Sequence, residues 1–235
     1  MSTIDIKKLS GYSLIVGPII ALICYFIQPG GVLGIGGRLD PTDFEAGAKI
    51  LTENSVLGIL TGLLIPAGLI TLLSGLLYFI ESLKGGNGYA LAKLGAPFIF
   101  IAITGWTVGS AIAIGISNGI ITGTNMGSIF FSINIPSTML FGLGGIFIAL
   151  GAASRQELNS RFAYVASVAA TLVFITAIIL AFAPEQGNTI SLVTGVCFII
   201  YTFWSISVSY THLRAHETRE DRGCRGGGAK KGGGG

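Results

Sequence analysis

Within residues 1–208, the densest group of side chains that can do chemistry along the connections between apolar runs lies between residues 38 and 45. The group holds one basic and three acidic residues: Arg38, Asp40, Asp43 and Glu45. A guanidinium and carboxylates at this spacing can bind a polar ligand through charge-assisted hydrogen bonds. The same acidic residues can instead start a helix, because carboxylates are favourable near a helix N-terminus. The sequence leaves both roles open, a ligand-contacting element or a structural connection.

A second group consists of uncharged polar residues inside or beside long apolar segments. Its members are Thr104, Trp106, Asn118 and Asn134. Hydroxyl, indole and amide groups can bind a neutral solute by hydrogen bonds, and together they can line a small polar cavity. The alternative is that they only form hydrogen bonds between neighbouring helices.

Several kinds of chemistry lack the residues they need. Residues 1–208 contain no histidine, and the long apolar runs contain no Asp, Glu, Lys or Arg. A His-ligated haem, a His-containing zinc site and a serine–histidine protease are therefore unsupported. A carboxylate proton relay within the membrane lacks its carboxylates as well. These absences favour a protein without a cofactor, a metal or an enzymatic activity.

The elements that position these residues are six long apolar runs. Hydrophobic residues make up 51% of the chain and charged residues 11%, and the mean hydropathy is +0.77. Runs of about 20 apolar residues are long enough to cross the hydrocarbon of a bilayer as helices. We therefore predict an all-α bundle of six transmembrane helices, with lipid as its main partner. The predicted spans are residues 10–28, 56–80, 94–116, 129–152, 162–183 and 189–208.

Charges in the loops predict the orientation. Six basic residues lie on one side, Lys7, Lys8, Lys84, Lys93, Arg155 and Arg161, against Arg38 and Lys49 on the other. By the positive-inside rule the N-terminus is cytoplasmic in a plasma membrane. A secretory signal peptide is the rival interpretation of the first span. Pro18 and the absence of a small-residue cleavage site favour a retained helix.

The outer connection after the first span predicts a short amphipathic helix near residues 41–54. Asp40 can cap it and Pro41 suits its first position. Phe44 and Leu51 fall on one face. We expect this helix to lie on the membrane interface or to cap the bundle.

Glycines and prolines recur within the predicted spans. Gly58 and Gly62, and again Gly105 and Gly109, are four residues apart. Small residues at this spacing let helices pack closely. We expect the second pair to mediate self-association, or contact with another membrane protein. The first four spans each hold a proline, at Pro18, Pro66, Pro97 and Pro136. Proline kinks a helix, and transporters use such breaks as gates.

The last 27 residues differ in character from the rest. The segment that begins at Ser209 resembles a translated transposase-type sequencing adapter, and the glycine runs that follow resemble translated poly-G. The alternative is a flexible, basic tail. We treat residues 209–235 as a non-native disordered tail. Without them the net charge is zero rather than +3, so the sequence does not predict a nucleic-acid partner.

Three weak motifs carry a resemblance. They are Gly11-Tyr12, the pattern Asp40…Asp43…Ala46…Ala48…Leu51, and Leu76-Leu77-Tyr78. Together they resemble small uncharacterised prokaryotic integral membrane proteins, and this resemblance implies a membrane bundle but no catalytic residues. We expect an accessory or scaffold protein, or a binder of an apolar ligand or lipid. The alternative is a facilitative transporter or channel for a small neutral solute.

Overall fold

The computed structural model describes residues 6–37, 42–122, 124–155 and 158–226, and these form helices joined by short connections. No strand occurs among the described residues, which confirms the predicted all-α class. The elements are α1 (Ile6–Ile27), α2 (Phe44–Glu53), α3 (Ser55–Ser82), α4 (Tyr89–Ser117), α5 (Thr124–Ala153), α6 (Ser160–Phe182), the 3-10 turn η1 (Pro184–Gln186) and α7 (Gly187–Gly226).

All of these helices except α2 contain a segment long and apolar enough to cross a membrane. These six segments span 20 to 29 residues, and their mean hydropathy ranges from 1.7 to 2.6. Each predicted span falls within one of them to within a residue or two. The chain is a polytopic helical membrane protein, and its many exposed leucine, isoleucine and valine side chains are suited to a lipid surrounding.

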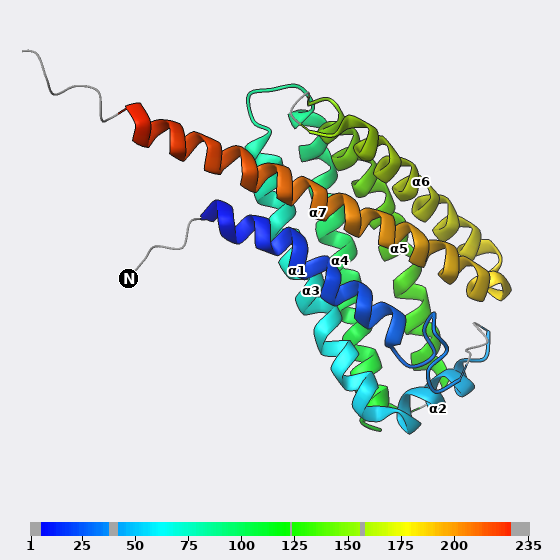
Figure 1. The fold of residues 1–235 in the computed structure, drawn as a ribbon. Helices are drawn as coiled ribbons and strands as arrows, with labels where there is room; N and C mark the ends of the chain where they lie inside the picture. The colour runs from blue at the N-terminus through cyan, green and yellow to red at the C-terminus, as the bar shows by residue number, and fades with distance from the viewer. Residues whose placement is uncertain (1–5, 38–41, 123, 156–157, 227–235) are drawn as a thin grey trace, which may run out of the picture.

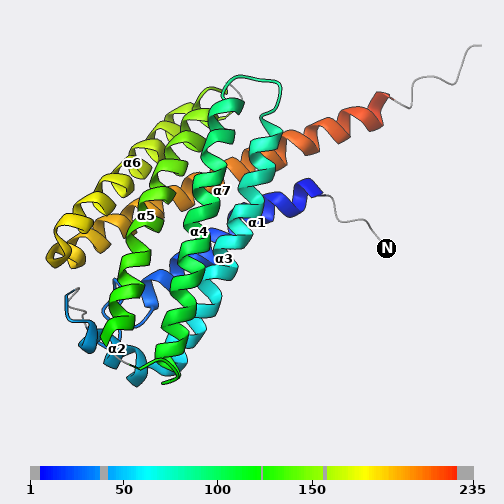
Figure 2. The same cartoon turned by 180° about the vertical axis from the view of Figure 1, so that it is seen from behind.

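The six spanning helices form a closed ring. Each packs against its sequence neighbour, in the order α1, α3, α4, α5, α6, α7, and α7 returns to pack against α1. Figure 1 shows α1 and α7 side by side and antiparallel on one face of the molecule. The view from behind in Figure 2 shows α3, α4, α5 and α6 as the opposite layer. The ring therefore encloses an interior that side chains from both layers must fill.

Glycines set the spacing of three of these helix pairs. A methyl group on Gly68 of α3 would lie 2.7 Å from the carbonyl oxygen of Gly17 on α1. Between α4 and α5, a methyl group on Gly95 would lie 2.6 Å from the carbonyl oxygen of Gly144. Gly142 of α5 approaches the backbone nitrogen of Phe174 on α6 in the same way. These backbones touch, so only glycine fits at the contact points.

The glycine pairs singled out in the sequence also pack within the chain. Gly58 and Gly62 of α3 face α4, where Gly62 lies against Ile114. Gly105 and Gly109 of α4 face α5. The surface expected to mediate self-association is therefore covered by the chain's own α5. The short connection between α4 and α5 explains this, because it makes the two helices antiparallel neighbours.

Two buried serines join α7 to α1. Ser205 Oγ donates to the Leu14 carbonyl and Ser209 Oγ donates to the Gly11 carbonyl, each at 2.7 Å. Leu14 lies four residues before Pro18, so its carbonyl lacks the usual helical donor. Ser205 supplies the missing hydrogen bond, which lets α1 carry a proline within an apolar environment.

Helix α7 continues to Gly226, whereas we expected disorder from residue 209. Neither glycine nor proline occurs between Val196 and Arg222. Extending an existing helix adds one hydrogen bond per residue, so nothing in that stretch stops it. The expected non-native origin of residues 209–235 is a separate question and stays a prediction.

Helix α2 caps one end of the ring. It packs against α3, α4 and α5, and the Phe44 ring lies 6.0 Å from that of Phe131. It begins at Phe44 rather than at residue 41, because Asp43 Oδ1 accepts a hydrogen bond from the Ala46 N–H at 2.9 Å. The loop before it turns tightly at Gly30, where φ is 69°, a conformation that favours glycine.

Candidate functional site

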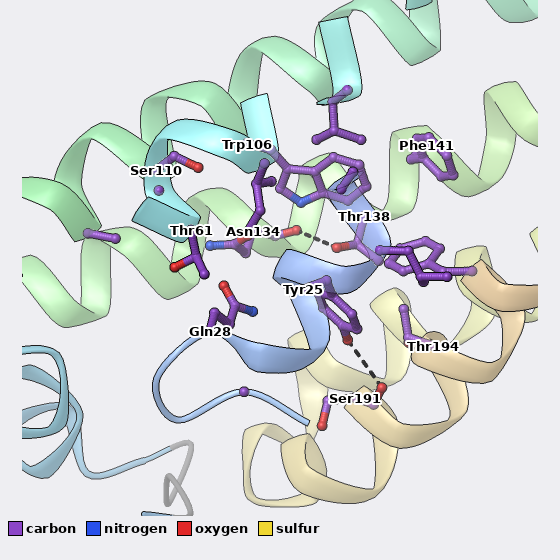
Figure 3. Close-up of a pocket in the computed structure, with 18 of the residues that line it drawn as sticks. Tyr25, Gln28, Thr61, Trp106, Ser110, Asn134, Thr138, Phe141, Ser191 and Thr194 are labelled. Carbon is purple, nitrogen blue, oxygen red and sulfur yellow. Dashed lines mark hydrogen bonds between the residues drawn. The ribbon is translucent and has the colours of Figure 1, made fainter. Parts of the chain in front are cut away.

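A cavity of about 290 Å³ lies inside the ring at the end that α2 covers (Figure 3). All six spanning helices contribute to its wall, and Leu51 of α2 reaches its rim. This volume lies at the lower end of the range for small-molecule sites. None of the residues that line it is Asp, Glu, Lys, Arg or His. The cavity therefore suits a small neutral molecule.

The cavity extends deep into the bundle. On α7 its wall runs from Gly187 to Thr202, and on α3 from Gly58 to Leu72. At 1.5 Å per residue these stretches measure about 20 Å, which is more than half of a hydrocarbon core of about 30 Å. We call this part of the bundle the cavity half, and the remainder, which holds Leu14, Phe79 and Trp204, the packed half.

An aromatic cluster closes the cavity toward the packed half. The Trp106 ring lies 5.2 Å from Phe141 and 6.0 Å from Phe198. Phe141 lies 5.5 Å from Tyr201, which in turn lies 5.0 Å from Trp204. These rings come from α4, α5 and α7, and most pairs adopt the edge-on or tilted geometry that aromatic pairs prefer. The cluster joins the two layers of the ring and forms the floor of the cavity.

Polar groups from four segments line the wall above this floor. They are Gln28 directly after α1, Thr61 on α3, Ser110 on α4 and Asn134 on α5. Figure 3 shows these side chains around one space beside the Trp106 ring. The Thr61 hydroxyl donates to the Leu57 carbonyl at 2.8 Å.

Asn134 is the most informative of these polar residues. Its Nδ2 donates to the Phe130 carbonyl at 2.8 Å, which fixes the amide orientation because a carbonyl can only accept. The Thr138 hydroxyl donates to the Asn134 backbone carbonyl at 2.8 Å. The side-chain Oδ1 forms no hydrogen bond to another described residue. It remains an available acceptor in the wall of the cavity.

Beside the cavity, hydrogen bonds join α7 to both of its neighbours in the ring, α1 and α6. The Tyr25 hydroxyl on α1 donates to the Ser191 carbonyl on α7 at 3.1 Å. The hydroxyls of Thr176 and Thr194 lie 3.3 Å apart and join α6 to α7. Tyr25, Ser191 and Thr194 also line the cavity, so these contacts hold α7 in place beside it.

The structure brings together some of the predicted residues and separates others. Trp106 and Asn134 line the cavity, as do Gly58 and Gly62. Thr104 is exposed on the outside of α4, where its hydroxyl donates to the Phe100 carbonyl at 2.9 Å. Helical periodicity explains this, because residues two apart in a helix point to nearly opposite sides. Asn118 ends α4 and is exposed beyond the cavity wall.

The predicted ionisable cluster has a structural role where it is described. Asp43 is exposed and caps α2, and Glu45 is exposed in the first turn of that helix. Arg38 and Asp40 lie outside the described residues. Neither Asp43 nor Glu45 lines the cavity. Within the part of the chain that the structure describes, these two acids stand at the start of α2, where carboxylates favour helix initiation, and their contact with a ligand stays a prediction.

Sequence reasoning did not single out Tyr25, Gln28, Thr61, Phe198 and Tyr201, which also line the cavity. A signal for two of them existed. Gln28 ends an apolar run and Thr61 lies between Gly58 and Gly62, so both are polar residues beside candidate packing faces. The aromatic residues had no such signal, because rings are common throughout apolar spans.

Comparison of the chain with protein-family models, curated proteins and solved structures finds no match. The functional argument therefore rests on the cavity and on the helices that form it.

Proposed function

We propose that this integral membrane protein binds a small, neutral, largely apolar molecule in the cavity of its helical ring. The observation that carries the proposal is a deep cavity whose lining contains no charged side chain, although several uncharged polar groups face it. A charged ligand would be buried there without a partner of opposite charge, at a cost of several kcal/mol. A neutral molecule incurs no such penalty.

The form of the cavity supports binding rather than a scaffold role alone. A protein that only organises partners needs no internal space, since close packing of its helices gives the more stable bundle. Here the packed half is filled by aromatic and aliphatic side chains, while the cavity half retains about 290 Å³. The floor of stacked rings also offers flat apolar surface to a ligand.

A cavity-filling substitution tests the proposal. Ala113 lines the cavity on α4, and Ala111 on the same helix is exposed on the outside. We expect Ala113→Phe to abolish saturable binding of a neutral hydrophobic fluorophore to the protein in lipid nanodiscs. Ala111→Phe adds the same ring to the outer surface, so it should leave binding unchanged. Equal binding by both variants would contradict the proposal.

Facilitative transport of a neutral solute is the second candidate. The observation that favours it is depth, since the cavity reaches the middle of the bundle and Pro18 lies in its wall. Transporters place substrates near the midplane beside broken helices. Transport would require the side chains of the aromatic cluster, Trp106, Phe141 and Phe198, to move apart so that a solute can pass through the floor of the cavity. Solute flux into proteoliposomes, lost in Asn134→Leu, supports transport, whereas binding without flux supports the binding protein.

We further propose a prokaryotic plasma membrane as the location, with the N-terminus in the cytoplasm. The support is the distribution of basic residues, six on the N-terminal side against two on the α2 side. This orientation makes the cavity open toward the outside of the cell. Fusion of a reporter that fluoresces only in the cytoplasm to the N-terminus tests it, and a dark fusion that is expressed and inserted would reverse the assignment.

A further inference from the structure

We infer that the ligand is an aliphatic or alicyclic alcohol: a neutral apolar body with one hydroxyl group, which binds between Asn134 and Trp106. The inference rests on the proposed function, because it names the class of molecule that the same cavity takes. It follows from the hydrogen-bonding groups that the helices leave unused, and from where these groups lie.

Asn134 offers an acceptor and Trp106 a donor in one cavity. The Asn134 Nδ2 is bound to the Phe130 carbonyl, and its Oδ1, on a residue that lines the cavity, forms no hydrogen bond among the described residues. The indole N–H of Trp106 can only donate, and it forms no hydrogen bond within the described chain. In Figure 3 the indole nitrogen lies on the edge of the ring that faces Asn134.

A hydroxyl group matches this pair better than other simple groups. It donates through its O–H to Asn134 Oδ1 and accepts from the Trp106 N–H through a lone pair. A ketone can only accept, and a hydrocarbon leaves both protein groups unpaired. A carboxylate would accept from Trp106 but would repel Asn134 Oδ1, and it would have no cation nearby.

The part of the cavity between Asn134 and the aromatic cluster is suited to an apolar body. From Asn134 the α5 wall continues for seven residues to Phe141, which is about 10 Å along the helix. Opposite it, α3 and α1 contribute Leu69, Leu72 and Ala21. A hydroxyl held at Asn134 therefore places an apolar body against the aromatic floor, with the hydroxyl toward the α2 end.

Tryptophan fluorescence can report this binding mode. The chain contains two tryptophans, so Trp204→Phe leaves Trp106 as the only one. The probes are 8-bromo-1-octanol, 1-bromooctane and 8-bromooctanoate, added to the protein in phosphatidylcholine nanodiscs at matched mole fractions in the membrane. Bromine at the far end of the chain then lies beside Phe141, whose ring is 5.2 Å from that of Trp106, and quenches Trp106. Ala113→Phe in the same background separates quenching from the cavity and quenching from the surrounding lipid.

We expect saturable quenching by the bromoalcohol at about tenfold lower concentration than by the bromoalkane, since two hydrogen bonds distinguish the probes. Bromooctanoate should be the weakest. Asn134→Leu should remove the preference for the alcohol, whereas Asn118→Leu, an equal change at an exposed site outside the cavity, should retain it. The probe series on the chain that keeps Asn134 is decisive even if Asn134→Leu fails to fold.

The outcomes separate the inference from the proposed function. Saturable quenching with equal half-saturation by alcohol and alkane overturns the alcohol assignment and leaves a cavity that binds apolar molecules. Tight binding of bromooctanoate also overturns it. Quenching that is linear for every probe, and equal with and without Ala113→Phe, overturns both the inference and the proposed function.

Discussion

The two halves of the bundle are built from equally apolar helices, yet one is solid and the other hollow. In the packed half, Phe79, Trp204 and Leu14 are each no more than 2% exposed. In the cavity half, the same six helices enclose a space lined by Thr61, Asn134 and their neighbours. The contrast shows that hydropathy alone does not decide whether a membrane helix packs or leaves room for a ligand.

The difference comes from the sizes of the residues that meet across the ring. In the packed half, large rings fill the interior while glycine and alanine allow the helix backbones to touch, as at Gly95 and Gly144. In the cavity half, small and medium residues such as Ala113, Ser110 and Thr61 face the interior itself. Small residues between helices close a seam, whereas small residues facing the centre of a ring leave a void.

The largest effect that tests this contrast is expected where the backbones of α1 and α3 touch, at Gly17 and Gly68. Gly68→Leu would force a side chain into the backbone of Gly17 and Ala21. We expect destabilisation of at least about 3 kcal/mol, because overpacking against backbone cannot be relieved by a rotamer change. Ala67→Leu on the adjacent, exposed position should be tolerated. Thermal unfolding in detergent measures both, and similar stability of the two variants would show that the seam is not tight.

Truncation of one aromatic side chain in each half should give the next largest effect on the free energy of unfolding. Trp204→Ala removes a ring that is 2% exposed in the packed half and should destabilise the protein by about 3 kcal/mol through the void it leaves. Phe130→Ala alters the wall of the cavity half, where space already exists. We expect a loss below about 1 kcal/mol there. Equal losses would remove the distinction between the two halves.

The smallest effect concerns the hydrogen bond that accompanies the proline in α1. Ser205→Ala deletes the donor to the Leu14 carbonyl. We expect a loss of about 0.6 kcal/mol, the average for hydrogen bonds between membrane helices, and at most about 1.7 kcal/mol. The double variant Ser205→Ala with Pro18→Ala should recover part of this loss, because the Leu14 carbonyl regains its helical donor. No recovery in denaturant unfolding would mean that the two residues act independently.

Particular residues show how far the sequence leads toward the site. Asn134 and Trp106 were predictable as cavity residues because polar groups are rare in apolar spans and need partners. Thr104 has the same chemistry but lies on the outer face, where its hydroxyl bonds to its own helix. Without the rotation of α4 about its axis, these cases cannot be distinguished. Gly105 and Gly109 were read as a packing face, but whether α5 or a second copy covers them depends on the order of helices in the ring.

By itself, the sequence determined that the chain forms six membrane-crossing helices, because lipid offers no hydrogen bonds and each apolar run must satisfy its own backbone. It also determined that any internal site would be uncharged, since the runs contain no ionisable side chain apart from tyrosine and cysteine. Only the tertiary structure decided where space remains. The return of α7 to α1 closes the ring, and closure brings Gln28, Thr61, Trp106 and Asn134 to one cavity although up to 106 positions separate them. Periodicity along one helix cannot encode that meeting, because it depends on how six helices turn toward a common centre.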